Sequence, residues 1–293
     1  MTSAAEARAA TAHPDILGES PVWCSRERRL LWVDVRAPAL RRLNPESGEV
    51  ESWPLPEVAA AVLLRGSGGV VLALKSGLHA FDPETAHLSS LLPIDEGHAE
   101  NRLNDAKCDR RGRIWFSTMW DFGRRTTGAL YRLQPDLTLT KVRSDITIPN
   151  AIAFAPDDRT IYFADTPTLR LEAAALDVRS GEVGPWRVLA DESAAPGKPD
   201  GATIDAEGFV WNARFGGGCL ARFAPDGRLD RLVPLPVSQP TSCTFGGAHL
   251  ATLYVTTATQ GLDAATLARQ PLAGHVLALD VGVGGLPEPA FAG

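Results

Sequence analysis

The sequence contains few cysteines, and none of them is spaced as a metal-binding or redox pair. Four occur in 293 residues, with no CxxC motif: Cys24, Cys108, Cys219 and Cys243. Isolated thiols in an intracellular chain of this length stay reduced, so we expect these four side chains to be buried as small apolar groups. A zinc site built on cysteine is disfavoured by the same spacings.

Long apolar runs and basic clusters are also missing. No stretch approaches the roughly 20 apolar residues of a membrane-spanning helix, and the 29 Lys and Arg are scattered through a chain of net charge −6. We therefore expect neither a membrane nor a nucleic-acid partner. The N-terminal segment MTSAAEARAATAHPD lacks the apolar core of a secretory signal. It predicts a cytoplasmic protein with a disordered tail over residues 1–14.

Two common catalytic signatures are absent. There is no GxSxG motif, so a serine-triad hydrolase has no support. The glycine-rich stretches GSGG (66–69) and FGGGC (215–219) lack the Lys-Ser/Thr pair and the helix of a phosphate-binding loop. Both stretches are typical of tight hairpins.

Strand–turn–strand units recur along the chain. RLLWVDV (29–35), RIWFSTM (113–119), FVWNARF (209–215) and TLYVTTA (252–258) occupy equivalent places, after turns such as DRRG and DAEG. Units begin near Glu19, Ala60, Asn104, Asn150, Asp200 and Pro240, which are 41, 44, 46, 50 and 40 residues apart. A period in the forties with four short strands is typical of a propeller blade. We predict an all-β, six-bladed β-propeller over residues 15–293, with one short helix at 261–269 capped by Asp263.

Polar residues stand at the same phase of four units. Because the innermost strands of a propeller run in one direction beside its axis, we expect Glu19, Asn104, Asn150 and Asp200 to meet at one mouth of the channel. Carboxylate and amide oxygens without Cys or His suit a hard divalent cation. For one residue alone, an ordinary turn role is the simpler interpretation; recurrence at one phase favours the cation site. Arg102 is either solvated or an axial cation that binds a substrate oxygen.

The motifs also have the order of a known family. LGESPVW, NRLNDAKCDRRGRIWFSTM, IPNAIAFAPDDRTIYFADT and PDGATIDAEGFVW together resemble the regucalcin (senescence marker protein)/gluconolactonase family, near its bacterial sugar lactonases, including xylonolactonase-like members. The likeness covers about residues 15–280. It implies a six-bladed propeller with one divalent metal in its channel.

The resemblance also implies roles for single residues. It makes Glu19 and Asn150 metal ligands, and Asp200 both a ligand and the proton-transfer residue. It makes Arg102 and Asn104 binders of the sugar lactone, with Asn104 also contacting the metal directly or through water. Ala151 stands where the family has a glycine, which is tolerable at negative φ and costly otherwise. Asp121, in STMWDFG, is the nearest counterpart of an acidic substrate contact.

These implications define the expected function. We expect a divalent-metal-dependent lactonase that hydrolyses pentono- or gluconolactones to aldonic acids in sugar catabolism, as a monomer or small homo-oligomer. The cation is Ca, Mn, Zn, Mg or Fe(II), which the ligand types do not rank. A non-catalytic calcium-binding scaffold is one alternative. A metal-dependent esterase or phosphotriesterase at the same site is another.

Overall fold

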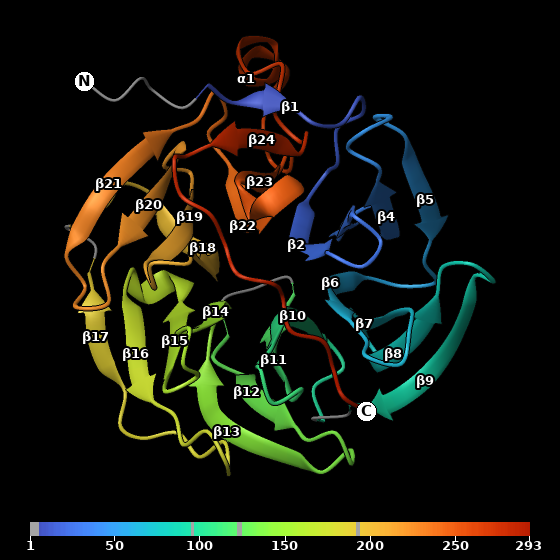
Figure 1. Ribbon diagram of the computed structural model, residues 1–293, viewed down its shortest axis with the longest axis vertical. Coiled ribbons are helices and arrows are strands. Elements are labelled where there is room, and N and C mark those ends of the chain that lie inside the picture. Colours follow the sequence, from blue (N-terminus) through green and yellow to red (C-terminus); the bar gives the residue numbers. More distant parts are fainter. Residues whose placement is uncertain (1–5, 95–96, 122–124, 192–193) are drawn as a thin grey trace.

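In the computed structural model, which describes residues 6–94, 97–121, 125–191 and 194–293, six four-stranded antiparallel sheets surround a central axis (Figure 1). The predicted six-bladed β-propeller is therefore confirmed. Each of the six predicted unit starts lies in the first, innermost strand of a blade.

The first three blades follow one another along the chain. Blade one comprises β2 (Gly18–Cys24), β3 (Arg29–Asp34), β4 (Ala39–Leu43) and β5 (Val50–Pro54). Blade two comprises β6 (Ala59–Leu64), β7 (Val70–Leu74), β8 (Gly77–Asp82) and β9 (His87–Pro93). Blade three comprises β10 (Asn101–Cys108), β11 (Ile114–Trp120), β12 (Gly128–Leu133) and β13 (Leu139–Ile146).

The remaining blades complete the ring. Blade four comprises β14 (Pro149–Phe154), β15 (Thr160–Asp165), β16 (Leu171–Ala175) and β17 (Arg187–Ala190). Blade five comprises β18 (Lys198–Ile204), β19 (Val210–Phe215), β20 (Cys219–Phe223) and β21 (Leu229–Pro234). Blade six comprises β22 (Pro240–Gly246), β23 (Thr252–Thr257), β24 (Leu277–Asp280) and β1 (Arg8–Ala9). Two 3₁₀ turns, η1 (Thr166–Thr168) and η2 (Ala248–Leu250), and helix α1 (Ala264–Arg269) lie in connections.

The N-terminal segment supplies the outermost strand of the last blade. Arg8 pairs with Ala278 and Ala9 with Leu277 in antiparallel register, and the amide of Ala10 donates to the carbonyl of Val276. The prediction of a disordered tail is therefore wrong for residues 8–14. The Ala-rich segment has no strand pattern of its own, and it becomes a strand because β24 offers it an unpaired edge.

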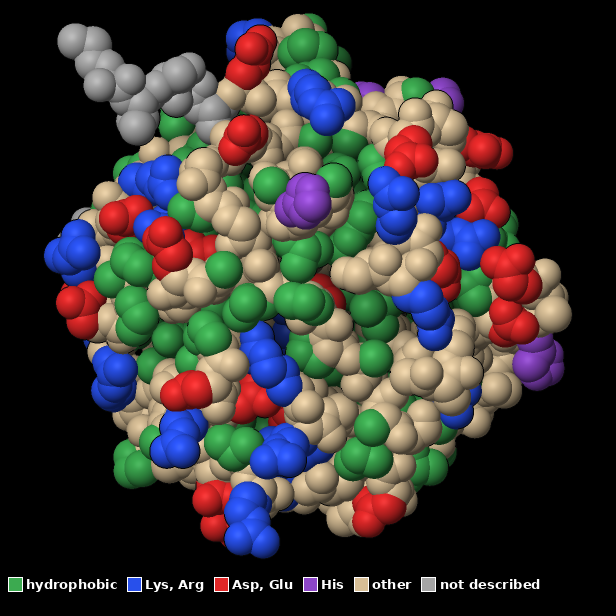
Figure 2. Space-filling view, in the orientation of Figure 1, with side chains coloured by type: hydrophobic (Ala, Val, Ile, Leu, Met, Phe, Trp, Pro, Cys, Tyr) green, Lys and Arg blue, Asp and Glu red, His purple; other side chains and the backbone are tan. Residues whose placement is uncertain are grey.

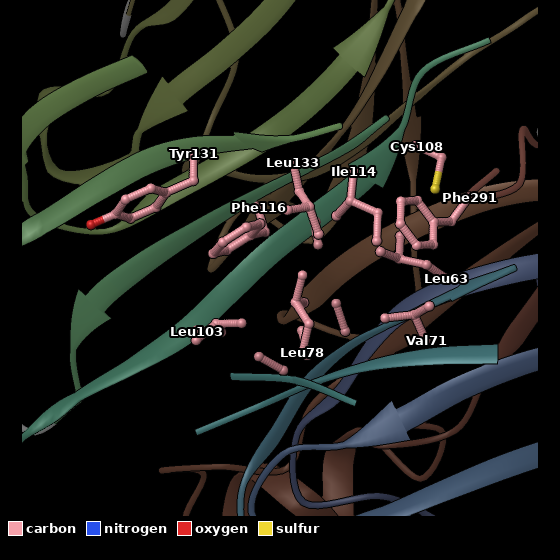
Figure 3. Packing of buried hydrophobic residues seen from close by; sticks show 14 of the residues in the cluster. Leu63, Val71, Leu78, Leu103, Cys108, Ile114, Phe116, Tyr131, Leu133 and Phe291 are labelled. Atoms are coloured by element: carbon pink, nitrogen blue, oxygen red, sulfur yellow. The ribbon is translucent and has the colours of Figure 1, made fainter. Parts of the chain in front are cut away.

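Side chains at the junctions between blades form the core. Between blades two and three, Leu63, Val71 and Leu78 face Ile114, Phe116 and Leu133 (Figure 3). All four cysteines are free and buried, as predicted. Helix α1 lies between β23 and β24, and the Asp263 carboxylate caps it by accepting the amide of Thr266. Among the described residues, no helix is long and apolar enough to cross a membrane.

Residues 281–293, the C-terminal segment, cross the ring at the end of the channel where the innermost strands finish (Figure 1). The amide of Phe291 donates to Leu64, and its carbonyl accepts from Gly66. Glu288 Oε1 lies 3.2 Å from Lys107 Nζ and 3.1 Å from Thr244 Oγ1. On this face acidic and basic side chains are interspersed around the rim (Figure 2). The segment therefore covers one end of the channel, and the opposite end holds the candidate site.

Candidate active site

Each innermost strand shifts its register against the next strand near its beginning. The shifts fall after Glu19, Ala59, Leu103, Asn150, Pro199 and Pro240. A β-bulge interrupts the alternation of side chains and re-aims the residue that it contains. The polar residues of four blades therefore lie at bulges, which aim them into the channel.

Two of these bulges place a non-glycine residue in the left-handed region. Ser20, after Glu19, has a φ of 51°, and Ala151, after Asn150, has a φ of 58°. Ala151 therefore does not have the negative φ at which an alanine would fit this position without backbone strain. The left-handed conformation costs an alanine roughly 1–2 kcal/mol, which burial of its methyl group in the core between blades four and five partly offsets.

The channel mouth contains a cavity of about 400 Å³. All six predicted site residues line it: Glu19, Arg102, Asn104, Asp121, Asn150 and Asp200. Asp34 and Asp165, at the ends of β3 and β15, do not line the cavity and accept backbone amides.

The carboxyl groups of Glu19 and Asp200 line the same cavity, and both are desolvated by burial. Burial, followed by the charge of Asp105, raises the pKa of Glu19 from 4.5 to about 8. Burial, followed by the charges of Glu19 and Asp105, raises the pKa of Asp200 well above its ordinary value. Two such groups ionise together only when a positive charge lies beside them.

An ordered chain of side-chain hydrogen bonds runs beside these acids. Arg102 Nη1 donates to Asn104 Oδ1 at 2.7 Å, and Asn104 Nδ2 donates to Asn150 Oδ1 at 3.1 Å. Asn150 Nδ2 donates to Thr166 Oγ1, which donates to the carbonyl of Pro199, each at 2.8 Å. This network connects blades three, four and five, and it fixes the orientation of both amides.

The other wall of the cavity is an arginine–aspartate cluster. Arg36 Nη1 and Nη2 both donate to the Asp121 carboxylate at 2.9 Å, and Arg102 Nε donates to it at 2.5 Å. Against its desolvation, hydrogen bonds from Arg36 and the charge of Arg102 lower the pKa of Asp121. Arg36 also donates to Gln260 Oε1. Asp121 is thereby ionised, and it holds two guanidinium groups in place.

Several site residues had no signal in the sequence. Arg36 and Gln260 lie on the connections after β3 and β23 and enter the cavity from outside the repeated phase. Lys198 lines the cavity at the start of β18. Asp105 lies in β10, where its carboxylate accepts the amide of Ile152 at 2.8 Å; burial raises its pKa to about 6. Only for Asp105, which follows Asn104 directly, did the motif offer a usable hint.

The donor set can be tested against a metal ion. Within the described part of the chain, no group of three or more His, Cys, Asp or Glu is arranged to hold a metal. Two carboxylates and the oriented Oδ1 of Asn150 remain as oxygen donors. Hard divalent cations accept carboxylate and amide oxygens together. The residues present therefore fit a calcium-like cation bound by few protein ligands.

Comparison with known proteins supplies an independent result. Residues 17–259 match the SMP-30/Gluconolactonase/LRE-like region. The chain is 38% identical over 281 residues to a 6-deoxy-6-sulfogluconolactonase of Pseudomonas putida, covering 96% of each chain. It is 36% identical over 283 residues to an L-arabinolactonase of Azospirillum brasilense, covering 94% of this chain and 92% of the relative. Its structure matches that of a calcium-binding protein, regucalcin, of Agrobacterium tumefaciens with a TM-score of 0.94, 31% identity and coverage of 98% and 97%.

Proposed function

Because the chain belongs to the SMP-30/gluconolactonase/LRE-like family, we propose that it is a metal-dependent sugar lactonase. Its substrates are aldonolactones, and its products are the open-chain aldonic acids. The observation that carries the proposal is the meeting of Glu19 and Asp200 in one cavity with the oriented amide of Asn150 and the guanidinium of Arg102. The names of two relatives, a sulfogluconolactonase and an L-arabinolactonase, support a five- or six-carbon sugar lactone.

Three oxygen-bearing side chains would hold the metal. Glu19 and Asp200 supply charge, and Asn150 supplies Oδ1, one lone pair of which is used by Asn104. When bound, a divalent cation supplies Lewis-acid polarisation of the lactone carbonyl. The relative from Agrobacterium tumefaciens is a calcium-binding protein, which supports calcium among the candidate ions.

Asp200 is the proposed proton-transfer residue. It takes a proton from the attacking water as the water oxygen bonds to the carbonyl carbon. The ring C–O bond then breaks, and the same proton passes to the departing ring oxygen, which becomes a hydroxyl group. A lactone is an activated ester, so a weakly basic carboxylate suffices for this transfer.

The arginine–aspartate cluster positions the sugar. Nε and Nη1 of Arg102 donate to protein acceptors, while Nη2 forms no hydrogen bond with the described residues. We assign this remaining donor to a sugar hydroxyl. Asp121 acts by fixing Arg36 and Arg102, and Asn104 acts mainly by orienting Asn150, since its Nδ2 and one lone pair of Oδ1 are already used.

Hydrolysis of single lactones tests the proposal. D-xylono-, L-arabinono- and D-gluconolactone are followed with a pH indicator, before and after EDTA and with metals restored one at a time. We expect turnover above the spontaneous rate, loss of it with EDTA, and recovery with at least one metal. Turnover of a phosphotriester but of no lactone would instead identify the protein as a metal-dependent phosphotriesterase. Metal binding without hydrolysis of any substrate would instead make the metal structural.

A further inference from the structure

The charges that line the cavity do not balance once the two acids bind a cation. The charged side chains there are three acids and three bases: Glu19, Asp121 and Asp200, and Arg36, Arg102 and Lys198. Asp121 is shared by the two arginines, and Glu19 and Asp200 are the proposed metal ligands. With a divalent cation present, the positive charges that line the cavity therefore exceed the negative ones by two, and still by one when Asp105, whose charge acts on both acids, is counted. This excess favours an anionic ligand.

Of the three cations that line the cavity, Lys198 is the one without a partner among the described residues. Its side chain is exposed at the cavity mouth, opposite Phe215 in the β18–β19 register. Within the described parts of the chain it forms no ion pair or hydrogen bond, whereas Arg36 and Arg102 both bind Asp121. A flexible ammonium group at this place is available to a ligand.

The position of Lys198 along the strand sets what it can reach. It precedes Asp200 by two residues in β18, which corresponds to ~7 Å along a strand. A lactone whose carbonyl carbon lies at Asp200 extends away from the metal ligands toward the mouth, because the C-terminal segment covers the other end of the channel. The substituent farthest from the ester then lies near the ammonium group of Lys198.

We propose that the preferred lactone carries an anionic group remote from its ester, and that Lys198 binds this group. The inference rests on the proposed lactonase function and deepens it by naming the substrate class. A carboxylate, a sulfonate and a phosphate share the required chemistry, and all three accept hydrogen bonds from an ammonium group. Lys198 is thus a specificity-determining residue, and it is not needed for proton transfer.

The kinetic test compares charged and neutral lactones of one sugar. The kcat/KM values are measured for D-glucono-1,5-lactone, its 6-phospho and 6-deoxy-6-sulfo derivatives, and D-glucaro-1,4-lactone. We expect the parent to prefer at least one charged lactone, and Lys198→Met to lower the charged-to-neutral ratio about tenfold. Lys198→Arg retains the preference. The control Lys141→Met, which removes a lysine from the outer strand β13, leaves the ratio unchanged.

A binding measurement makes the result independent of catalysis. Calorimetric titration of 6-phosphogluconate and gluconate into the calcium-supplemented parent and Lys198→Met gives a ratio of affinities without turnover. We expect the parent alone to favour the charged acid. Equal loss for charged and neutral ligands, or no preference in the parent, would overturn the inference. Failure to hydrolyse any lactone would count against the proposed function, while the titration would still decide the role of Lys198.

Discussion

Nδ2 of Asn104 donates to Oδ1 of Asn150 at 3.1 Å and so joins the innermost strands of the third and fourth blades. The same nitrogen donates to the carbonyl of Pro149 at 2.7 Å. Because Asn104 Oδ1 is held by Arg102, the amide group cannot rotate without losing bonds on both sides. Asn104 therefore determines which atom of Asn150 faces the cavity.

Replacement of Asn104 should weaken metal binding although Asn104 is not among the three proposed ligands. In Asn104→Ala we expect calcium affinity to fall about 10- to 100-fold, as for other residues that orient a ligand. Calorimetric calcium titration measures the change. Asn44→Ala, in the exposed β4–β5 hairpin, serves as the matched control. Unchanged affinity in Asn104→Ala would show that Asn150 keeps its orientation without this partner.

Asp200 lies near the start of β18 and Asp205 directly follows its end, and the two should respond differently to the same substitution. Asp200→Asn removes the proposed proton acceptor, so we expect kcat to fall about 10²–10⁴-fold. Asp205 accepts from Trp211 Nε1 and Arg222 Nε at 2.9 and 2.8 Å, away from the cavity. Asp205→Asn should reduce the free energy of unfolding by about 2 kcal/mol.

Urea unfolding and lactone hydrolysis separate these effects. For Asp205→Asn we expect turnover per folded molecule to remain near that of the parent. An active Asp200→Asn enzyme would remove Asp200 from the role of proton acceptor. A loss of turnover in folded Asp205→Asn would show that the far end of β18 affects the site.

The residues that the sequence located are those that the repeat itself determines. Glu19, Asn150 and Asp200 all lie at the bulge near the start of an innermost strand, Glu19 and Asn150 just before it and Asp200 within it. The phase could not locate Arg36, whose partner Asp121 is 85 residues away in the sequence. Connections after β3 and β23 differ in each blade, so their reach into the channel depends on the assembled ring.

Local strand signals fail for a different reason at two positions. β1 has two residues, and its conformation depends on pairing with β24, which is 268 residues later in the chain. At Ala151 the sequence predicted a cost only for a positive φ, and the sign of φ depends on the bulge in β14. In both cases tertiary pairing sets the backbone, and local propensity does not.

The metal-free protein should become less stable as pH rises. The folded state raises the pKa of Glu19 from 4.5 to about 8, so between these values the folded protein binds a proton that the unfolded chain has lost. The free energy of unfolding then decreases across this range, by a few kcal/mol for a shift of this order. Asp200, raised in the same direction, adds to the loss.

Thermal unfolding in EDTA at about pH 5.5 and about pH 8 measures this dependence. We expect a lower Tm at the higher pH, and a smaller difference after calcium is added, because a cation favours the ionised carboxylates. Calcium binding at neutral pH should also release protons into a weak buffer. A Tm in EDTA that rises over this range would contradict the raised pKa values of both acids.

The covered end of the channel provides a test of the C-terminal segment. Glu288 and Lys107 form an ion pair whose side chains are 11% and 15% exposed. Against its desolvation, the charges of Glu288 and Asp105 raise the pKa of Lys107. Lys107 thus interacts with two acids, whereas Glu288 interacts with one cation and accepts a hydrogen bond from the hydroxyl of Thr244. Because Lys107→Met leaves two buried carboxylates without a cation, it should lower the free energy of unfolding more than Glu288→Gln does, by about 3 kcal/mol against about 1–2 kcal/mol.

Urea unfolding of both variants and of the double variant measures these losses and the coupling between them. Equal costs that add without coupling would mean that the C-terminal segment is held by its backbone contacts alone.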